Sequence, residues 1–279
     1  MSAVRRAAVV LAVVGVAAAT VAVGVRAMLG RLDLPIAQDA RCDLVNTPYS
    51  LSTEQAANAA TVTAIAVTRA LPVRAAEIAL ATALQESKLV NVEYGDRDSL
   101  GLFQQRASQG WGSPGQILDP RYAAGKFYDH LVKVPNWQRK PLTEAAQAVQ
   151  RSGHPTAYAQ WEDQARALAK AFAGAVPAGV SCAFPAPTIA ARPARVVELL
   201  ALDLPATRLS VTGRVAEVRP ARSGWATASW LVAHADRLGI EVVGWSGQRW
   251  TRADGWRDDT SVPRGRVRLE VAPVGSTGT

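Results

Sequence analysis

Apolar residues fill one uninterrupted run near the start of the chain. Residues 7–25 read AAVVLAVVGVAAATVAVGV, nineteen positions without a charge, and two arginines stand directly before them. At about 1.5 Å of rise per residue, such a helix nearly spans a hydrocarbon core of about 30 Å. The positive-inside rule then predicts residues 1–6 as a cytoplasmic tail and a single-pass anchor with the rest outside. The alternative is a secreted protein, cleaved after about residue 19, because Ala17 and Ala19 form an A-x-A site.

After a linker at residues 26–41, apolar residues recur at helical spacing through residues 42–182. Capping or proline signals mark the helix starts, at Ser52 with Gln55, Pro72, Asp119, Thr143 and Pro155. The second helix, VRAAEIALATALQES, has an apolar face and runs into Glu86. These signals predict an almost entirely helical domain over residues 42–182.

The continuous helical pattern stops after residue 182. Residues 183–194, AFPAPTIAARPA, are rich in proline and predict an extended spacer. In residues 195–279 the segments LSVTGRVAEV, IEVVGWSGQRWT and GRVRLEV alternate like strands, and GWATASWLVAHADRLG is typical of a helix. The fold class is therefore α+β: a mainly α-helical domain followed by a small α+β module of unknown role, large enough to fold alone.

Charge and ligand counts exclude several classes of protein. The net charge of +8 is scattered rather than gathered into a basic stripe, which argues against a nucleic-acid partner. The three His and two Cys are too dispersed for a metal site, so no metal is expected as partner or cofactor. A single span cannot form a solute pathway, which excludes a transporter.

Cys42 and Cys182 bracket the predicted helical domain. In an exported, oxidising setting they are expected to form a disulfide, and closing so long a loop stabilises by about 4 to 5 kcal/mol. The alternative is a pair of unrelated buried thiols.

The chemistry-bearing stretch is ALQESKLVNVEYGDRDSLGLFQQRASQGWG, where polar residues interrupt apolar helical sequence. Half-burial of Glu86 against apolar side chains would disfavour its ionised form, as a general acid for a glycosidic oxygen requires. Gln104 and Gln105 are adjacent amides suited to sugar hydroxyls or an amide. The competing interpretation is an ordinary solvated charge at a helix end.

These motifs resemble a known superfamily. An E-S pair at a helix end, G-L-F-Q about fifteen residues later and helices after a D-P start resemble the lytic transglycosylases and goose-type lysozymes, more narrowly a group of actinobacterial exported lysozyme-like proteins. The resemblance covers about residues 50–175 and implies cleavage of peptidoglycan glycan strands between muramic acid and glucosamine, without a cofactor. Glu86 is then the catalytic acid and later the base. The resemblance implies that Gly101, Leu102, Phe103 and Gln104 shape the cleft beside Glu86. Ser87, Tyr94, Gln105 and Gln150 are further candidate substrate-binding residues.

The chain departs from this superfamily in its third motif, usually A-Y-N-x-G. Here the loose counterpart supplies Gln150 for the Asn amide, whereas Val149 cannot replace a Tyr hydroxyl. Asp96 and Asp98 are the nearest candidates for a second acid, although Asp in such a turn commonly bonds its own backbone. The alternative function is therefore a catalytically inactive peptidoglycan-binding or scaffolding protein of the cell envelope. Trp111, Tyr158 and the five tryptophans of the C-terminal module are expected to lie in the core or, for some, to stack on sugars.

Overall fold

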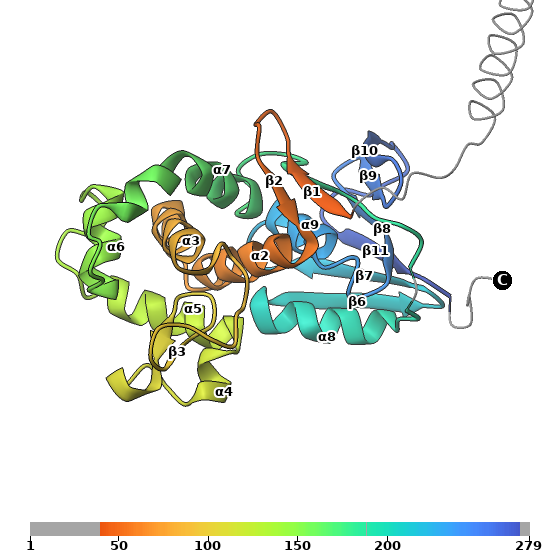
Figure 1. The fold of residues 1–279 in the computed structure, drawn as a ribbon. Helices are drawn as coiled ribbons and strands as arrows, with labels where there is room; N and C mark the ends of the chain where they lie inside the picture. Colours follow the sequence, from red (N-terminus) through yellow and green to blue (C-terminus); the bar gives the residue numbers. More distant parts are fainter. Residues whose placement is uncertain (1–39, 188, 274–279) are drawn as a thin grey trace, which may run out of the picture. The chain divides into compact units, whose positions relative to one another are not determined.

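The computed structural model describes residues 40–187 and 189–273, and Figure 1 shows their arrangement. Within these residues no helix combines the length and apolar character that a membrane crossing needs. The predicted tail and anchor, residues 1–25, lie outside the described part of the chain, as does most of the predicted linker that follows them. The described residues form a mixed α+β fold with antiparallel sheets.

Two helices begin where their capping signals predicted. Helix α2 spans Thr53–Thr68, and Ser52 and Gln55 form the expected reciprocal capping box at its start. Helix α3 spans Val73–Ser87 directly after Pro72, and it ends at Lys88, whose φ of 57° is left-handed. Residues 75–84 of α3 are all buried, so this helix is enclosed on every side except near its ends.

The other helices of this region follow α3 in the chain. They are the 3₁₀ helix η1 (Ala107–Gln109), α4 (Pro114–Ile117), α5 (Pro120–Leu131), α6 (Leu142–Gln150), the 3₁₀ helix η2 (Ala157–Trp161) and α7 (Glu162–Phe172). Figure 1 shows α5, α6 and α7 arranged around α3, which also packs against α2 and η2. A central helix with neighbours on most faces needs small and apolar side chains, which explains its alanine-rich sequence; of its buried polar residues, Glu77 pairs with Arg74 and the Thr82 hydroxyl donates to the Ile78 carbonyl.

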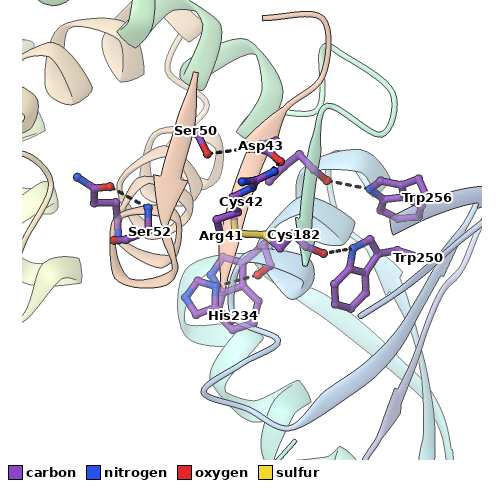
Figure 2. The surroundings of a disulfide bond; sticks show 12 residues. Arg41, Cys42, Asp43, Ser50, Ser52, Cys182, His234, Trp250 and Trp256 are labelled. Carbon is purple, nitrogen blue, oxygen red and sulfur yellow. Dashed lines mark hydrogen bonds and ion pairs between the residues drawn. A yellow bond between two sulfur atoms is a disulfide. The ribbon is translucent and has the colours of Figure 1, made fainter. Parts of the chain in front are cut away.

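Residues 42–182 are less helical than predicted. Strands β1 (Arg41–Leu44), β2 (Ser50–Ser52) and β5 (Val180–Ala183) form an antiparallel sheet in the order β2-β1-β5, and β3 (Ser99–Leu100) pairs with β4 (Gln105–Arg106). These strands have two to four residues each, too few for alternation to reveal them. Cys42 and Cys182 are directly opposed on β1 and β5 and form the predicted disulfide (Figure 2).

The C-terminal region consists of two helices and one sheet. Helix α8 (Pro193–Asp203) has no counterpart among the predicted elements, whereas α9 (Gly224–Ala233) is the predicted helix. The six strands are β6 (Ala206–Thr212), β7 (Val215–Pro220), β8 (Ile240–Trp245), β9 (Gln248–Thr251), β10 (Gly255–Asp258) and β11 (Val267–Val271). Their order is β10-β9-β8-β11-β7-β6, and every neighbouring pair is antiparallel.

The C-terminal sheet region shares one hydrophobic core with the helical region. Helix α9 packs against α2, α7 and β5. Two indoles reach strand β5, because Trp250 Nε1 donates to the Cys182 carbonyl at 3.1 Å and Trp256 Nε1 donates to the Val180 carbonyl at 2.8 Å (Figure 2). In the proline-rich segment, Phe184 is buried and its amide donates to the Arg252 carbonyl at 3.1 Å. That residues 195–279 fold alone stays a prediction.

Candidate active site

Glu86 lies in the last turn of α3, half-buried, where the enclosed helix emerges toward the surface. Its Oε1 accepts a hydrogen bond from the Tyr158 hydroxyl at 2.8 Å and a longer one from Gln150 Nε2 at 3.4 Å. Both donors are neutral groups. Among the described residues, no ion pair involves Glu86. The carboxyl group is thus fixed in direction without being neutralised by a cation.

The shorter hydrogen bond to Glu86 comes from the Tyr158 hydroxyl group. Tyr158 belongs to η2, 72 residues beyond Glu86, and its ring is fully buried. Burial raises the pKa of Tyr158, and the neighbouring Glu86 raises it further, so the phenol keeps its proton and donates. Tyr158 was predicted only as a core aromatic, because helical spacing reports which face is buried and not what the hydroxyl group meets.

Gln150 is the last residue of α6, and its amide makes two contacts. Nε2 donates to the Phe103 carbonyl at 2.8 Å and reaches Glu86 at 3.4 Å. One amide therefore links the end of α6 to the glycine-containing loop and to Glu86. Val149 is buried and does not take part in this contact.

The loop after α3 is held against the end of that helix. The Ser87 hydroxyl donates to the Leu102 carbonyl at 2.9 Å and to the Ala83 carbonyl at 3.1 Å. Gly101 has a φ of +72°, and a Cβ there would lie 2.8 Å from the Ile117 carbonyl oxygen, so only glycine fits. The Leu102 and Phe103 side chains are fully buried, which leaves their carbonyl groups to contact the site.

Two predicted amides point away from Glu86. Gln104 Nε2 donates to the Tyr94 and Gly101 carbonyls, both at 3.3 Å, and so closes its own loop. Gln105 is 2% exposed and donates to the Ala123 carbonyl at 3.1 Å, inside the helical region. A side chain so enclosed is not accessible to a glycan strand. Tyr94 is 77% exposed at the surface of the loop.

The two candidate second acids lie in different surroundings. Asp98 accepts from Arg106 Nε at 2.8 Å, from the Ser108 amide at 2.8 Å and from the Ser108 hydroxyl at 2.9 Å. These hydrogen bonds, the Ser108 amide first and Arg106 next, lower the pKa of Asp98 well below its usual range. Such a carboxylate is a weak base and shapes the turn. The Asp96 side chain is 90% exposed.

A hollow of about 340 Å³ adjoins Gln150. It is lined by Gln109, Trp111, His130, Val149, Gln150 and Arg151. Trp111 is buried and stacks on His130, with 4.3 Å between the ring centroids. The hollow is therefore lined in part by the end of α6, including Gln150, whose amide hydrogen-bonds Glu86, whereas Glu86 is not among its lining residues.

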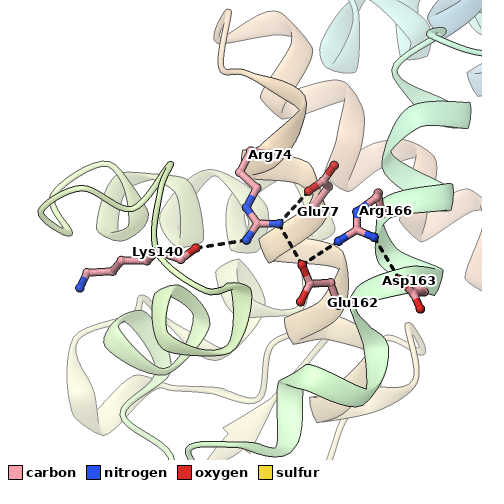
Figure 3. Close-up of polar contacts among 6 residues, drawn as sticks. All are labelled: Arg74, Glu77, Lys140, Glu162, Asp163 and Arg166. Atoms are coloured by element: carbon pink, nitrogen blue, oxygen red, sulfur yellow. Dashed lines mark hydrogen bonds and ion pairs between the residues drawn. The ribbon is translucent and has the colours of Figure 1, made fainter.

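An ion-pair network fixes the start of α7, directly after η2 (Figure 3). Arg74 Nη1 lies 2.9 Å from Glu77 Oε2 and 3.4 Å from Glu162 Oε1, and Arg166 Nη2 lies 2.8 Å from the same Glu162 oxygen. Arg74 also donates to the Lys140 carbonyl at 3.2 Å. Because Tyr158 precedes Glu162 by only four residues, this network helps to hold η2 over α3.

Glu86 and Gln150 are thus the predicted site side chains that meet, and Ser87 and Gly101 position the loop beside them. Gln104 does not converge on Glu86. Comparison of the chain with models of known protein families and with curated proteins finds no match in either case.

Proposed function

We propose that the protein cleaves the glycan strands of peptidoglycan, with Glu86 as general acid and then base, and that residues 42–182 form a lysozyme-like domain. The observation that carries the proposal is the Glu86 carboxyl group, half-buried at a helix end and aligned by two neutral donors from η2 and α6. A general acid needs this combination of fixed direction and partial shelter.

The two oxygens of Glu86 differ in a way that suits proton transfer. Oε1 accepts from both Tyr158 and Gln150, whereas Oε2 has no hydrogen-bond partner among the described residues. Because Tyr158 and Gln150 both donate to Oε1, a proton carried by Glu86 in the proposed reaction would sit on Oε2. Oε2 would then deliver that proton to the glycosidic oxygen.

The proposed reaction needs only this one carboxyl group. Glu86 donates its proton to the glycosidic oxygen as the bond from C1 breaks, and the bonding electron pair leaves on that oxygen. The carboxylate then accepts a proton from an incoming hydroxyl whose oxygen bonds to C1. That hydroxyl belongs to the sugar itself, giving an anhydro end, or to water, giving a reducing end. Asp98, engaged by Arg106 and Ser108, is poorly placed to be a nucleophile.

The disulfide supports a location outside the cytoplasm, because such bonds persist in oxidising compartments. We place the described residues on the outer side of the membrane, anchored by residues 7–25 or secreted after cleavage near residue 19. Peptidoglycan strands and the membrane are then the proposed partners.

Digestion of purified sacculi tests this function. The protein is expected to release soluble muropeptides with new glycan ends, detected by mass spectrometry, and products one water lighter indicate anhydro ends. Glu86→Gln is expected to abolish the release, whereas Glu144→Gln, an exposed acid on α6, serves as the matched control. Equal release by the parent and Glu86→Gln would refute the role of Glu86.

The second candidate is a peptidoglycan-binding protein without turnover. Val149, buried where the superfamily has a polar cleft residue, favours it, and so does the engagement of Asp98 by Arg106 and Ser108. Sedimentation with sacculi, scored together with product analysis, separates the two. Binding without new glycan ends supports the binder, and new ends support the enzyme.

A further inference from the structure

The hollow beside Gln150 has an unusual lining for a carbohydrate groove. Its six residues include Arg151 and His130 but no Asp or Glu. Arg151 is exposed, and none of the ion pairs among residues 40–187 and 189–273 involves it. The guanidinium group is therefore available to an anion at this position.

The backbone of Arg151 is held in place at the end of α6. It ends α6 with a left-handed φ of 51°, and its amide donates to the Gln147 carbonyl at 2.8 Å. It directly follows Gln150, whose amide reaches Glu86. Gln150 and Arg151 both line the hollow, so a ligand bound there by Arg151 would also contact the residue that hydrogen-bonds Glu86.

Trp111 and His130, which also line the hollow, are poorly suited to stack on a sugar ring. The Trp111 ring is buried and stacks on His130, so it offers little face to a sugar. Lys126, four residues before His130 on α5, and Lys133, three residues after it, flank this part of the lining along the chain. Burial lowers the pKa of His130, and Lys133 and Lys126 lower it further. Asp129 acts on His130 in the opposite direction and more weakly. The surroundings of the hollow are on balance positive.

We propose that this hollow binds a carboxylate carried by the glycan strand, and that Arg151 is the specificity-determining residue. A guanidinium group pairs with a carboxylate through two parallel hydrogen bonds, which gives direction as well as attraction. The inference rests on the proposed function, because it assumes a strand lying across Glu86. In peptidoglycan the carboxylate belongs either to the lactyl ether of muramic acid or to the stem peptide.

Binding measurements on a non-cleaving background test this inference. Glu86→Gln is titrated with three oligosaccharides of equal length: a neutral chito-oligosaccharide, a peptide-free muramyl oligosaccharide and one that carries stem peptides. Arg151→Asn, added to this background, removes the charge while Asn tolerates the left-handed backbone. It is expected to weaken binding of the carboxylate-bearing ligands about 10-fold and to leave the neutral ligand unchanged. Arg151→Lys should restore part of the loss.

Arg139→Asn is the matched control, since Arg139 is an exposed arginine of the same region that does not line the hollow. If Arg151→Asn loses affinity for the peptide-free muramyl ligand, Arg151 binds the lactyl carboxylate. If it loses affinity only for the peptide-bearing ligand, Arg151 binds a carboxylate of the stem peptide. Equal losses in Arg151→Asn and Arg139→Asn, an equal loss for the neutral ligand, or no binding by the background protein would overturn the inference. If the parent protein does not cleave sacculi but Arg151→Asn still weakens binding of the carboxylate-bearing ligands, the proposed cleavage activity is refuted. The proposed carboxylate-binding site then still stands.

Discussion

Two carboxyl groups at helix ends, Glu86 and Asp203, lie in opposite surroundings. Glu86 lies in the last turn of α3, is half-buried and, within the described part of the chain, accepts hydrogen bonds from the neutral donors Tyr158 and Gln150. Asp203 ends α8 and is fully buried. It pairs with Arg121 of α5, accepts from Trp230 Nε1 of α9 at 2.7 Å and from the Thr61 hydroxyl of α2 at 3.2 Å. One carboxyl group is left open on one side, and the other is closed on all sides.

The electrostatics of Asp203 follow from that closure. Burial raises the pKa of Asp203, and the Arg121 guanidinium group acts against it by favouring the charged form. A carboxyl group that joins four helices and has no exposed surface cannot reach a substrate. The comparison teaches that burial alone does not identify a catalytic acid. Glu86, the proposed acid, differs in that its Oε1 is held by Tyr158 and Gln150, its Oε2 has no hydrogen-bond partner among residues 40–187 and 189–273, and Gln150 also lines a hollow.

The sharpest test of this contrast is the stability of Asp203→Asn against that of Glu86→Gln. Removing the anion of a buried pair leaves its partner uncompensated, which costs about 3 to 5 kcal/mol. Because the Arg121 side chain is 29% exposed, we expect the lower end, about 3 kcal/mol. Glu86→Gln is expected to cost less than about 1 kcal/mol, since Tyr158 can still donate to the amide oxygen. Urea unfolding measures both, and similar losses would contradict the distinction.

Tyr158→Phe is expected to change catalytic activity by a smaller free energy than Asp203→Asn changes stability. The ring stays in place while Glu86 loses its shorter hydrogen bond, so kcat/KM for glycan cleavage should fall about 10-fold. Tyr128→Phe is the matched control, because that buried hydroxyl donates to the Val62 carbonyl at 2.9 Å, away from Glu86. A loss of activity equal in both variants would assign Tyr158 to packing alone.

The smallest expected effect concerns Asp98. Because its pKa in the folded chain is lowered, Asp98 contributes stability above about pH 4 that is lost as the pH falls toward the lowered value. Asp98→Asn should therefore be slightly less stable at neutral pH and should show a weaker decline in acid. Thermal unfolding from pH 7 to pH 3 measures this, with Asp96→Asn as the exposed control. If the stability of Asp98→Asn falls with decreasing pH as steeply as that of the parent, the turn does not depend on the charge of Asp98.

The local signals of the sequence predict much of the helical region. Ser52 with Gln55, Pro72, and Asp119 before Pro120 mark helix starts within a residue of those observed. Such signals work because capping and proline effects act within one turn. Helix α8 escapes prediction because it begins inside the proline-rich segment, at Pro193. The strands joined by the disulfide are too short for alternation to reveal them.

The candidate site is predictable only in part. Glu86 and Gln150 were singled out from motifs, and their amide-to-carboxyl contact appears in the structure. Tyr158 and Asp203 could not be assigned their contacts, because each depends on how distant helices pack. Gln105 was predicted to bind substrate, but its side chain is enclosed. Gln104 and Gln105 are indistinguishable in the sequence, but Gln105 lies on β4 and its side chain is directed into the helical region.

The most direct test of the central claim is the turnover number of Glu86→Gln on a defined glycan oligomer, with binding measured in parallel. The account predicts a fall of at least about 100-fold in kcat with nearly unchanged affinity, because positioned proton transfer contributes about 10²- to 10⁴-fold. A variant that turns over at the parent's rate would contradict it.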